Sequence, residues 1–242
     1  MGILRPKLIF LCLVFLGISV VPVSGKHWSN ADRSSSGIAP LPEEHGKAVV
    51  QIYAARTFGW RGALAVHTWI SMKSKGAENY VVSQVVGFRS RRNLPVLTST
   101  IDIPDRFWYG NMPSLLVDLR GEKAEVLIPE IIEAINTYPF KDRYLMWPGP
   151  NSNTFTAYIG RKIPELKLDL PSTAIGKDYL AGKIFSITPG GSGYQLSFFG
   201  LLGVSLSIEE GVEINILSLN FGVNPTKLQL KLPGIGVLGG KY

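Results

Sequence analysis

Ser152 and His67 are the two residues of this 242-residue chain whose types and surroundings suit covalent chemistry. Ser152 follows the rigid stretch Pro148-Gly149-Pro150 and is flanked by Asn151 and Asn153, which are favourable N-cap residues. Apolar residues then recur at helical spacing, so the pattern predicts that Ser152 lies at or next to a helix N-terminus. Such a terminus favours negative charge, and nucleophiles and bound anions are often held there.

The reaction that these residues would support is attack by Ser152 on an acyl carbon, with His67 taking the proton. Gln84, on the neighbouring predicted strand, would orient the imidazole, and backbone N–H groups at the helix start would hold the oxyanion. Both residues also have a structural interpretation. Ser152 is typical of a capped helix start without chemistry, and His67 is typical of a hydrogen-bonded core or interface histidine.

Asn151, Asn153, Trp147 and Trp69 are the candidate binding residues. The two asparagines either form a turn or bind a polar substrate. The two tryptophans and the other aromatic residues near them either line a carbohydrate or lipid groove or complete a hydrophobic core. Their convergence around Ser152 would favour the groove.

The sequence argues against several other kinds of site. Cys12 is the one cysteine and falls in a predicted targeting segment, so an exported chain would have no disulfide, thiolate nucleophile or cysteine metal site. His27 and His45 fall in a predicted spacer, which leaves His67 without partners for a metal. The glycine-rich stretch 190–193 lacks the lysine of a phosphate-binding loop. We therefore predict no metal and no cofactor.

The N-terminus has the features of a targeting segment. Arg5 and Lys7 precede the apolar residues 8–23, and small residues that fit signal cleavage follow. The apolar stretch is short for a membrane span, which needs roughly 20 residues. We predict a signal peptide or an N-terminal membrane anchor over residues 1–25, and then a flexible spacer over residues 26–45.

The positive charge of the chain indicates which partners are plausible. The net charge is +7, and removal of Arg5 and Lys7 would leave +5. Arg89, Arg91 and Arg92 concentrate this charge in one loop. Outside the cytoplasm such a loop would meet anionic lipid headgroups or cell-wall polymers, or would simply be solvated. We predict no nucleic-acid partner.

Hydrophobic periodicity predicts one α+β domain over residues 46–242. An antiparallel sheet from residues 48–90 packs on two helices, with a glycine-rich β segment at the C-terminus. The predicted strands are residues 48–53, 64–72, 80–88, 194–199, 201–208 and 212–221. The predicted helices are residues 122–138 and 152–162. Residues 93–113 are predicted as a long irregular segment, and residues 231–237 show no clear periodicity.

Several longer motifs resemble the bacterial domain-of-unknown-function family 3750, which is found in proteobacteria. The motifs are Phe58-Gly59-Trp60-Arg61-Gly62, His67-Thr68-Trp69, Pro148-Gly149-Pro150-Asn151-Ser152-Asn153-Thr154-Phe155, Thr173-Ala174-Ile175-Gly176-Lys177-Asp178-Tyr179 and Gly193-Tyr194-Gln195-Leu196-Ser197. The resemblance covers roughly residues 47–238. It implies no activity, because that family has no assigned catalytic residues. With the targeting segment, it implies a periplasmic protein or one anchored to the inner membrane and facing the periplasm.

A more distant likeness concerns circularly permuted papain-like proteins, namely the NlpC-like and lecithin-retinol-acyltransferase-like groups. In those enzymes a strand with the base histidine precedes a helix whose N-terminus holds the nucleophile. His67 and then Ser152 follow that order. Those enzymes use a cysteine, however, and the higher pKa of serine means that Ser152 would need a competent general base.

Two functional hypotheses follow. The first is an exported acyl or amide hydrolase, or an acyltransferase-like protein, that uses Ser152 and His67. The second is a non-catalytic envelope protein with a binding or structural role. Its partner would be an envelope lipid, a cell-wall fragment or a small polar ligand, and residues 8–23 would provide membrane association. A short distance between the Ser152 hydroxyl and a His67 ring nitrogen would favour the first hypothesis.

Overall fold

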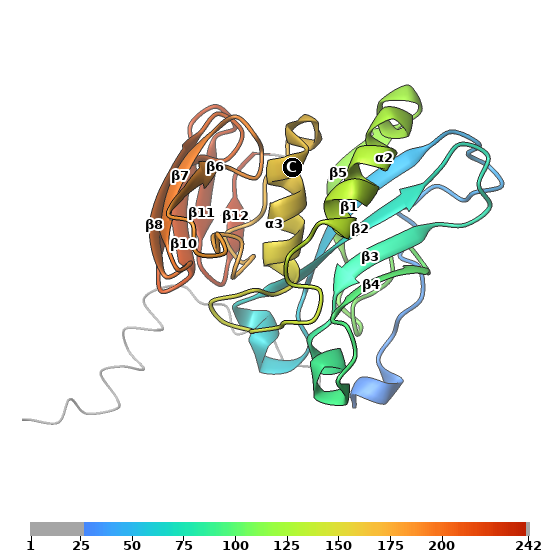
Figure 1. Cartoon of the computed structure of the whole chain (residues 1–242), viewed down its shortest axis with the longest axis horizontal. Helices are drawn as coiled ribbons and strands as arrows, with labels where there is room; N and C mark the ends of the chain where they lie inside the picture. The colour runs from blue at the N-terminus through green and yellow to red at the C-terminus, as the bar shows by residue number, and fades with distance from the viewer. Residues whose placement is uncertain (1–26, 241–242) are drawn as a thin grey trace, which may run out of the picture.

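Two antiparallel sheets and two α-helices make up residues 27–240, the part of the chain that the computed structural model describes (Figure 1). This arrangement confirms the predicted α+β class. Residues 1–26 and 241–242 lie outside the described residues, and so does the predicted targeting segment. Within residues 27–240, no helix is long and apolar enough to cross a membrane.

The first sheet has five strands in the order β4-β3-β2-β1-β5. Its strands are β1 (Val49–Arg56), β2 (Val66–Lys73), β3 (Val81–Val85), β4 (Leu97–Ile101) and β5 (Ser114–Arg120). The helices α2 (Glu122–Asn136) and α3 (Ser152–Lys162) pack on one face of this sheet and form the main core with it. Of four short 3-10 helices, η1 (Trp28–Asn30) precedes β1, and η2 (Gly59–Ala63), η3 (Gly87–Arg92) and η4 (Pro164–Leu166) lie in connections between the other elements.

The predicted helix over residues 122–138 is present as α2, two residues shorter. Its buried side chains recur at the three-and-four spacing of one helix face, as the sequence predicts. They are Ala124, Leu127, Ile128, Ile131, Ala134 and Ile135. Pro129 lies on the exposed side of this helix. The second predicted helix is also present, and its bounds, residues 152–162, match those of α3.

The central strand β2 is buried on both faces. Val66, Thr68 and Ile70 point towards the helices, whereas His67 and Trp69 point to the opposite face, because successive side chains of a strand alternate. A second, smaller core covers that opposite face.

Residues from the predicted spacer help to build this second core. The buried Asp105 carboxylate accepts hydrogen bonds from the Ser35 and Ser36 hydroxyls and from the backbone N–H groups of residues 38–39. This differs from the flexible spacer that we predicted for residues 26–45. Ser35 and Ser36, which resemble a linker in the sequence, instead donate to a buried carboxylate 69–70 residues away.

Three other segments also differ in detail from the prediction. The strand predicted over residues 80–88 ends at Val85 and is followed by η3, and the irregular segment 93–113 contains β4. The strand predicted over residues 212–221 is a hairpin. Leu217 and Ser218 both have positive φ, at 54° and 64°, and form its turn.

The second sheet has seven strands, each paired with the next along the chain. The strands are β6 (Phe185–Ile187), β7 (Gly193–Phe198), β8 (Leu202–Ser207), β9 (Gly211–Ile216), β10 (Leu219–Asn224), β11 (Gln229–Leu232) and β12 (Gly236–Leu238). The unassigned tail 231–237 thus contributes the last two strands. In Figure 1 this sheet stands beside α3, which lies between it and the first sheet.

The second sheet turns its polar face inward, towards the body of the protein. Its inward side chains include Gln195, Ser205, Glu213, Asn215 and Lys231, all buried. Its outward side chains are apolar and exposed. An antiparallel sheet with one solvated face usually shows the opposite pattern, with the apolar side inward.

A buried network of charges attaches the polar face to the segment after α3. Lys177 Nζ donates to Glu213 at 2.5 Å and to Asp178 at 3.0 Å. Lys231 Nζ donates to Asp169 at 2.6 Å and to Glu213 at 2.8 Å. Burial alone would lower the pKa of each lysine, but the adjacent carboxylates outweigh it and hold the pKa of both above the usual value.

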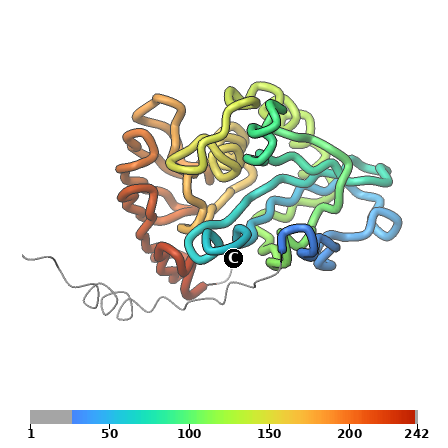
Figure 2. The backbone as a smooth tube through the Cα atoms, turned by 90° about the horizontal axis from the view of Figure 1, so that it is seen from below, coloured from blue at the N-terminus to red at the C-terminus, as the bar shows by residue number. Residues whose placement is uncertain are grey.

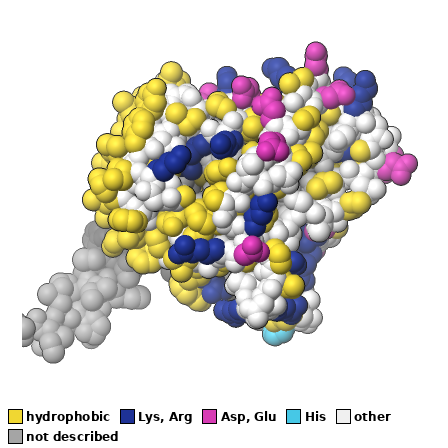
Figure 3. Space-filling view, in the orientation of Figure 1, with side chains coloured by type: hydrophobic (Ala, Val, Ile, Leu, Met, Phe, Trp, Pro, Cys, Tyr) yellow, Lys and Arg dark blue, Asp and Glu magenta, His cyan; other side chains and the backbone are white. Residues whose placement is uncertain are grey.

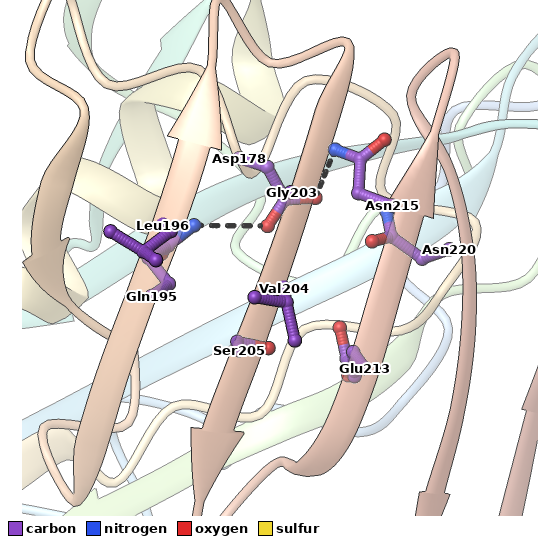
Figure 4. A pocket seen from close by; sticks show the side chains of 9 residues that line it. All are labelled: Asp178, Gln195, Leu196, Gly203, Val204, Ser205, Glu213, Asn215 and Asn220. Carbon is purple, nitrogen blue, oxygen red and sulfur yellow. Dashed lines mark hydrogen bonds between the residues drawn. The ribbon is translucent and has the colours of Figure 1, made fainter.

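Amide side chains complete this layer. Asp178 accepts hydrogen bonds from Gln195 Nε2 at 3.3 Å and from Asn215 Nδ2 at 3.1 Å (Figure 4). Burial raises the pKa of the Asp178 carboxyl, but the positive charges of Lys177 and Arg161 outweigh burial. The net pKa is below the usual value, so the carboxyl is ionised. Ionic and amide contacts therefore fix the seven-stranded sheet in place, where a hydrophobic core would do so in most proteins.

Candidate functional site

The start of α3 is a closed N-cap. The Asn151 side-chain oxygen accepts from the N–H groups of Asn153 at 2.9 Å and Thr154 at 3.1 Å. The Thr154 hydroxyl oxygen in turn accepts a hydrogen bond from the Asn151 N–H at 3.1 Å. This second bond completes a capping box. Two of the backbone donors that would hold an oxyanion are therefore already occupied.

The Asn151 and Asn153 amides are also bonded within the protein. Asn151 Nδ2 donates to the Met146 and Ile175 carbonyls at 3.0 and 2.9 Å. Asn153 Nδ2 donates to the Val66 and Ile175 carbonyls at 3.1 and 2.8 Å. Both side chains are buried, so they tie the helix start to the first sheet and to the segment that follows α3.

Ser152 is the first residue of α3 and is buried. Its carbonyl accepts from the Thr68 hydroxyl at 3.2 Å and from the Thr156 hydroxyl at 3.1 Å. Among the described residues, its own hydroxyl has no hydrogen-bond partner. A nucleophilic serine needs a general base within hydrogen-bond reach, directly or through one water.

His67 lies in an aromatic stack. Its Nε2 is 2.9 Å from Gln84 Oε1, so Gln84 contacts the imidazole as the sequence predicts. The ring lies parallel to Trp108, with centroids 3.7 Å apart and planes at 12°, and 5.8 Å from the Trp69 ring. Burial lowers the pKa of His67 to about 4, although the Gln84 contact raises it slightly. The imidazole is therefore neutral at physiological pH.

The first sheet separates His67 from Ser152. Thr68, the residue after His67, points towards α3 and donates to the Ser152 carbonyl. Because neighbouring side chains of a strand point to opposite faces, the imidazole lies on the other face with Trp108. No hydrogen bond joins the two side chains in residues 27–240.

The two candidate tryptophans occupy different environments. Trp69 is fully buried in the second core, where it stacks on Tyr53 at 5.5 Å and donates to the Pro104 carbonyl at 2.7 Å. Trp147 is 47% exposed, and its indole N–H donates to the Leu217 carbonyl at 3.1 Å, in the turn of the second sheet. Trp69 therefore belongs to the second core, whereas Trp147 lies at the surface beside the second sheet.

Three segments lie at one end of the molecule, and we call them together the basic end. It comprises residues 58–64, 87–94 and 139–147. A Cβ at Gly87 would lie 2.5 Å from the Tyr144 ring, so η3 packs against the third segment. The Lys141 carbonyl accepts from two backbone N–H groups just after η3. The segments lie at the lower end of Figure 1, the end seen in Figure 2.

The basic end combines cations with exposed aromatic and apolar side chains. Its cations are Arg61, Arg89, Arg91, Arg92, Lys141 and Arg143, against one acidic residue, Asp142. Its exposed apolar side chains are Trp60, Leu64, Phe88, Leu94, Leu145, Met146 and Trp147. Arg61 lies 5.9 Å from the Trp60 ring and Arg92 lies 6.0 Å from the Phe88 ring, which places charge and aromatic surface side by side. Sequence analysis identified the three arginines of η3 but not this combination.

A second surface was missed from the sequence. We call it the apolar sheet face, and it is the outward side of the seven-stranded sheet. Its residues are Phe185, Tyr194, Leu196, Phe198, Leu202, Val204, Leu206, Val212, Ile214, Ile216, Phe221, Val223, Leu230 and Leu238. Their side chains are 39–66% exposed. Figure 3 shows hydrophobic side chains gathered over this side of the molecule, at the left.

No group of three or more acidic, histidine or cysteine side chains in residues 27–240 is arranged to bind a metal ion.

The comparisons with known proteins give one finding. The model of a family described as "Protein of unknown function (DUF3750)" matches residues 47–179, which is more than half of the chain. No curated protein and no solved structure matches. The likeness to permuted papain-like enzymes stays a prediction from the order of His67 and Ser152 in the sequence.

Proposed function

We propose that this chain, which belongs to the DUF3750 family, is a non-catalytic protein of the cell envelope that binds anionic lipid surfaces through its basic end. The observation that carries the proposal is the composition of that end. Six cations and one acidic residue come together there with exposed tryptophan, phenylalanine and methionine side chains. Cations attract anionic headgroups, and amphipathic aromatic rings favour the membrane interface.

The position of the basic end supports this role. It is formed by connections between elements, which project beyond the rigid sheet and helices that hold them. Trp60 is 66% exposed and Phe88 is 51% exposed, so both rings are available to a lipid interface without unfolding. Each lysine or arginine near an anionic surface contributes about 1 kcal/mol, and several together give useful affinity.

The predicted targeting segment agrees with the same location. As an export signal, residues 8–23 would deliver the domain to the periplasm, and as an anchor they would hold it at the inner membrane. The first described element, η1, lies at the lower end of the molecule in Figure 1, as the basic end does. An anchor that leads into η1 would therefore hold the basic end close to the lipid.

The catalytic alternative, a hydrolase or acyltransferase-like protein that uses Ser152 and His67, is less well supported. The imidazole lies across the sheet from α3, and the Asn151 cap occupies the N–H groups that an oxyanion would need. Gln84 orients the imidazole within an aromatic stack, and the stack gives His67 a structural role.

The test is quenching of tryptophan fluorescence by brominated lipids, with the full chain reconstituted in vesicles. Any anchor is then present in every sample, so differences report on the domain itself. We expect stronger quenching in phosphatidylglycerol vesicles than in phosphatidylcholine vesicles, because Trp60 and Trp147 enter only the anionic interface, whereas Trp28 of η1 stays close to any anchor in both lipids.

Two charge-reversal pairs provide the comparison. Arg91→Glu with Arg92→Glu should abolish the extra quenching in anionic lipid, since the double variant loses two attractive charges and gains two repulsive ones. Lys75→Glu with Lys123→Glu makes the same change of charge at exposed positions near the opposite ends of the β-strands, and should leave the quenching intact. Equal quenching in the two pairs, or in the two kinds of lipid, would refute the proposal.

A further inference from the structure

The apolar sheet face is continuous across all seven strands. The strand register places its residues in cross-strand rows, since directly paired residues of antiparallel strands point to the same side. One row reads Phe185, Leu196, Val204, Ile214 and Phe221. A second row reads Tyr194, Leu206, Val212, Val223, Leu230 and Leu238, and the half-buried Ile187 of β6 pairs with Tyr194 at its end. Neither row contains a charged residue.

The orientation of this face is fixed by the opposite side of the same strands. The inward rows contain Gln195, Glu213, Asn215 and Lys231, which the buried charge network and its amides bind. Turning the apolar side inward would remove these charges from their partners. The sheet therefore presents apolar side chains outward as part of its folded state.

The size of the face matches that of a protein interface. A large apolar side chain presents on the order of 100 Å² of surface. Fourteen such side chains at about half exposure therefore amount to on the order of 700 Å². The largest apolar patch of a typical monomer is roughly 300–600 Å², and a standard interface buries about 800 Å² on each partner.

The composition favours a second copy of this chain as the partner. The fourteen residues are aliphatic or aromatic, with no lysine, arginine, aspartate or glutamate, as at the core of homodimer interfaces. A lipid-binding surface would carry the cations and tryptophans that this protein has at the basic end. In a β-sandwich, each of the two sheets likewise turns one apolar face towards the other sheet.

We infer that the apolar sheet face is the interface of a homodimer, in which the seven-stranded sheets of two copies pack face to face. The sheets lie about 10 Å apart, as in other sheet-on-sheet packings. The same patch on both copies is self-complementary under a two-fold axis. This inference rests on the register, area and composition of the face and does not depend on lipid binding.

Ile214 marks the centre of the interface. It lies within β9, the middle strand of the seven, and its row lies between the row of Val212 and the row that pairs Leu202 with Ile216. A two-fold axis that runs between the sheets through the centre of the face places Ile214 opposite its own copy, whether the axis follows the strands or crosses them. A cysteine there is therefore within reach of the equivalent cysteine of the partner.

The experiment is cross-linking of the full chain in intact membranes with a bifunctional maleimide of short spacer. Cys12→Ser removes the one natural cysteine, and Ile214→Cys introduces a new one. We expect a cross-linked species of twice the mass of the monomer, which is 26.5 kDa for the uncleaved chain. The control is Val126→Cys, on the exposed side of α2, a similar aliphatic position at 61% exposure, which should give monomer only.

A charge on the face should abolish the dimer. Val204 is exposed, so the chain should still fold with lysine at this position. When Val204→Lys is combined with Ile214→Cys, the cross-link should disappear. A monomer-only result for Ile214→Cys, or equal cross-linking of both cysteine positions, would overturn the inference. So would quenching of a fluorophore at Ile214→Cys by lipid-bound quenchers, which would make lipid the occupant of the face.

Discussion

Replacement of Glu213 by glutamine tests whether the buried charges hold the second sheet in place. Glu213 is 2% exposed at the side chain and bridges Lys177 of the segment after α3 with Lys231 of β11. Glutamine keeps nearly the same shape and removes the negative charge. The variant therefore isolates the electrostatic part of the attachment.

The expected loss of stability follows from the remaining partners. Removal of one member of a buried ion pair costs about 3–5 kcal/mol, because an uncompensated charge stays buried. Lys177 retains Asp178 at 3.0 Å, and Lys231 retains Asp169 at 2.6 Å, so each lysine keeps one carboxylate. We therefore expect the lower end of the range, about 3 kcal/mol.

The assay is guanidinium unfolding of the full chain, followed by circular dichroism, for Glu213→Gln and for Glu78→Gln. Glu78 is exposed in the β2–β3 connection, and its replacement should change the free energy of unfolding by less than about 0.5 kcal/mol. A loss below about 1 kcal/mol for Glu213→Gln would refute the argument that this network fixes the inverted sheet.

Three further outcomes are expected. A fluorophosphonate probe should not label Ser152, and labelling that disappears in folded Ser152→Ala and His67→Ala variants would contradict the non-catalytic proposal. Because the folded-state pKa of His67 is lowered to about 4, the native protein binds fewer protons than the unfolded chain, so stability falls by up to about 3 kcal/mol as pH drops from about 6.5 to about 4. The His67→Gln variant should lose less stability over this pH range when its unfolding is measured. The same dependence of unfolding free energy on pH in the variant and the native chain would contradict this role of His67. Asn151→Ala should lower the free energy of unfolding by about 2–4 kcal/mol, because it removes the cap of α3 and two buried amide contacts, and a loss as small as that of Glu78→Gln would show the cap to be unimportant.

The main elements of the fold could be predicted because local signals are strong there. The apolar spacing of residues 122–138 and the Asn151 cap before Ser152 specify α2 and α3 almost to the residue. The alternation of β2 was also visible, with His67 and Trp69 on one face. The same alternation places His67 on the opposite face of the sheet from Thr68, and Thr68 is the residue that contacts α3.

The two candidate surfaces could not be predicted in full because they depend on long-range packing, and only Arg89, Arg91 and Arg92 of the basic end were visible in the sequence. A strand with alternating apolar residues does not reveal which face is inward, and the usual expectation places the apolar side inside. The lysines and acids that reverse this expectation are spread over residues 169–231. Likewise, the three segments of the basic end are far apart in sequence, and two of them, residues 87–94 and 139–147, come into contact only in the fold.

Hydrogen exchange of the full chain reconstituted in vesicles tests the central claim most directly. With anionic lipid, we predict slower exchange in residues 58–64, 87–94 and 139–147 than with neutral lipid, and no such difference at the β2–β3 connection. Exchange that is the same in both lipids, or slower only in other parts of the chain, would contradict lipid binding through the basic end.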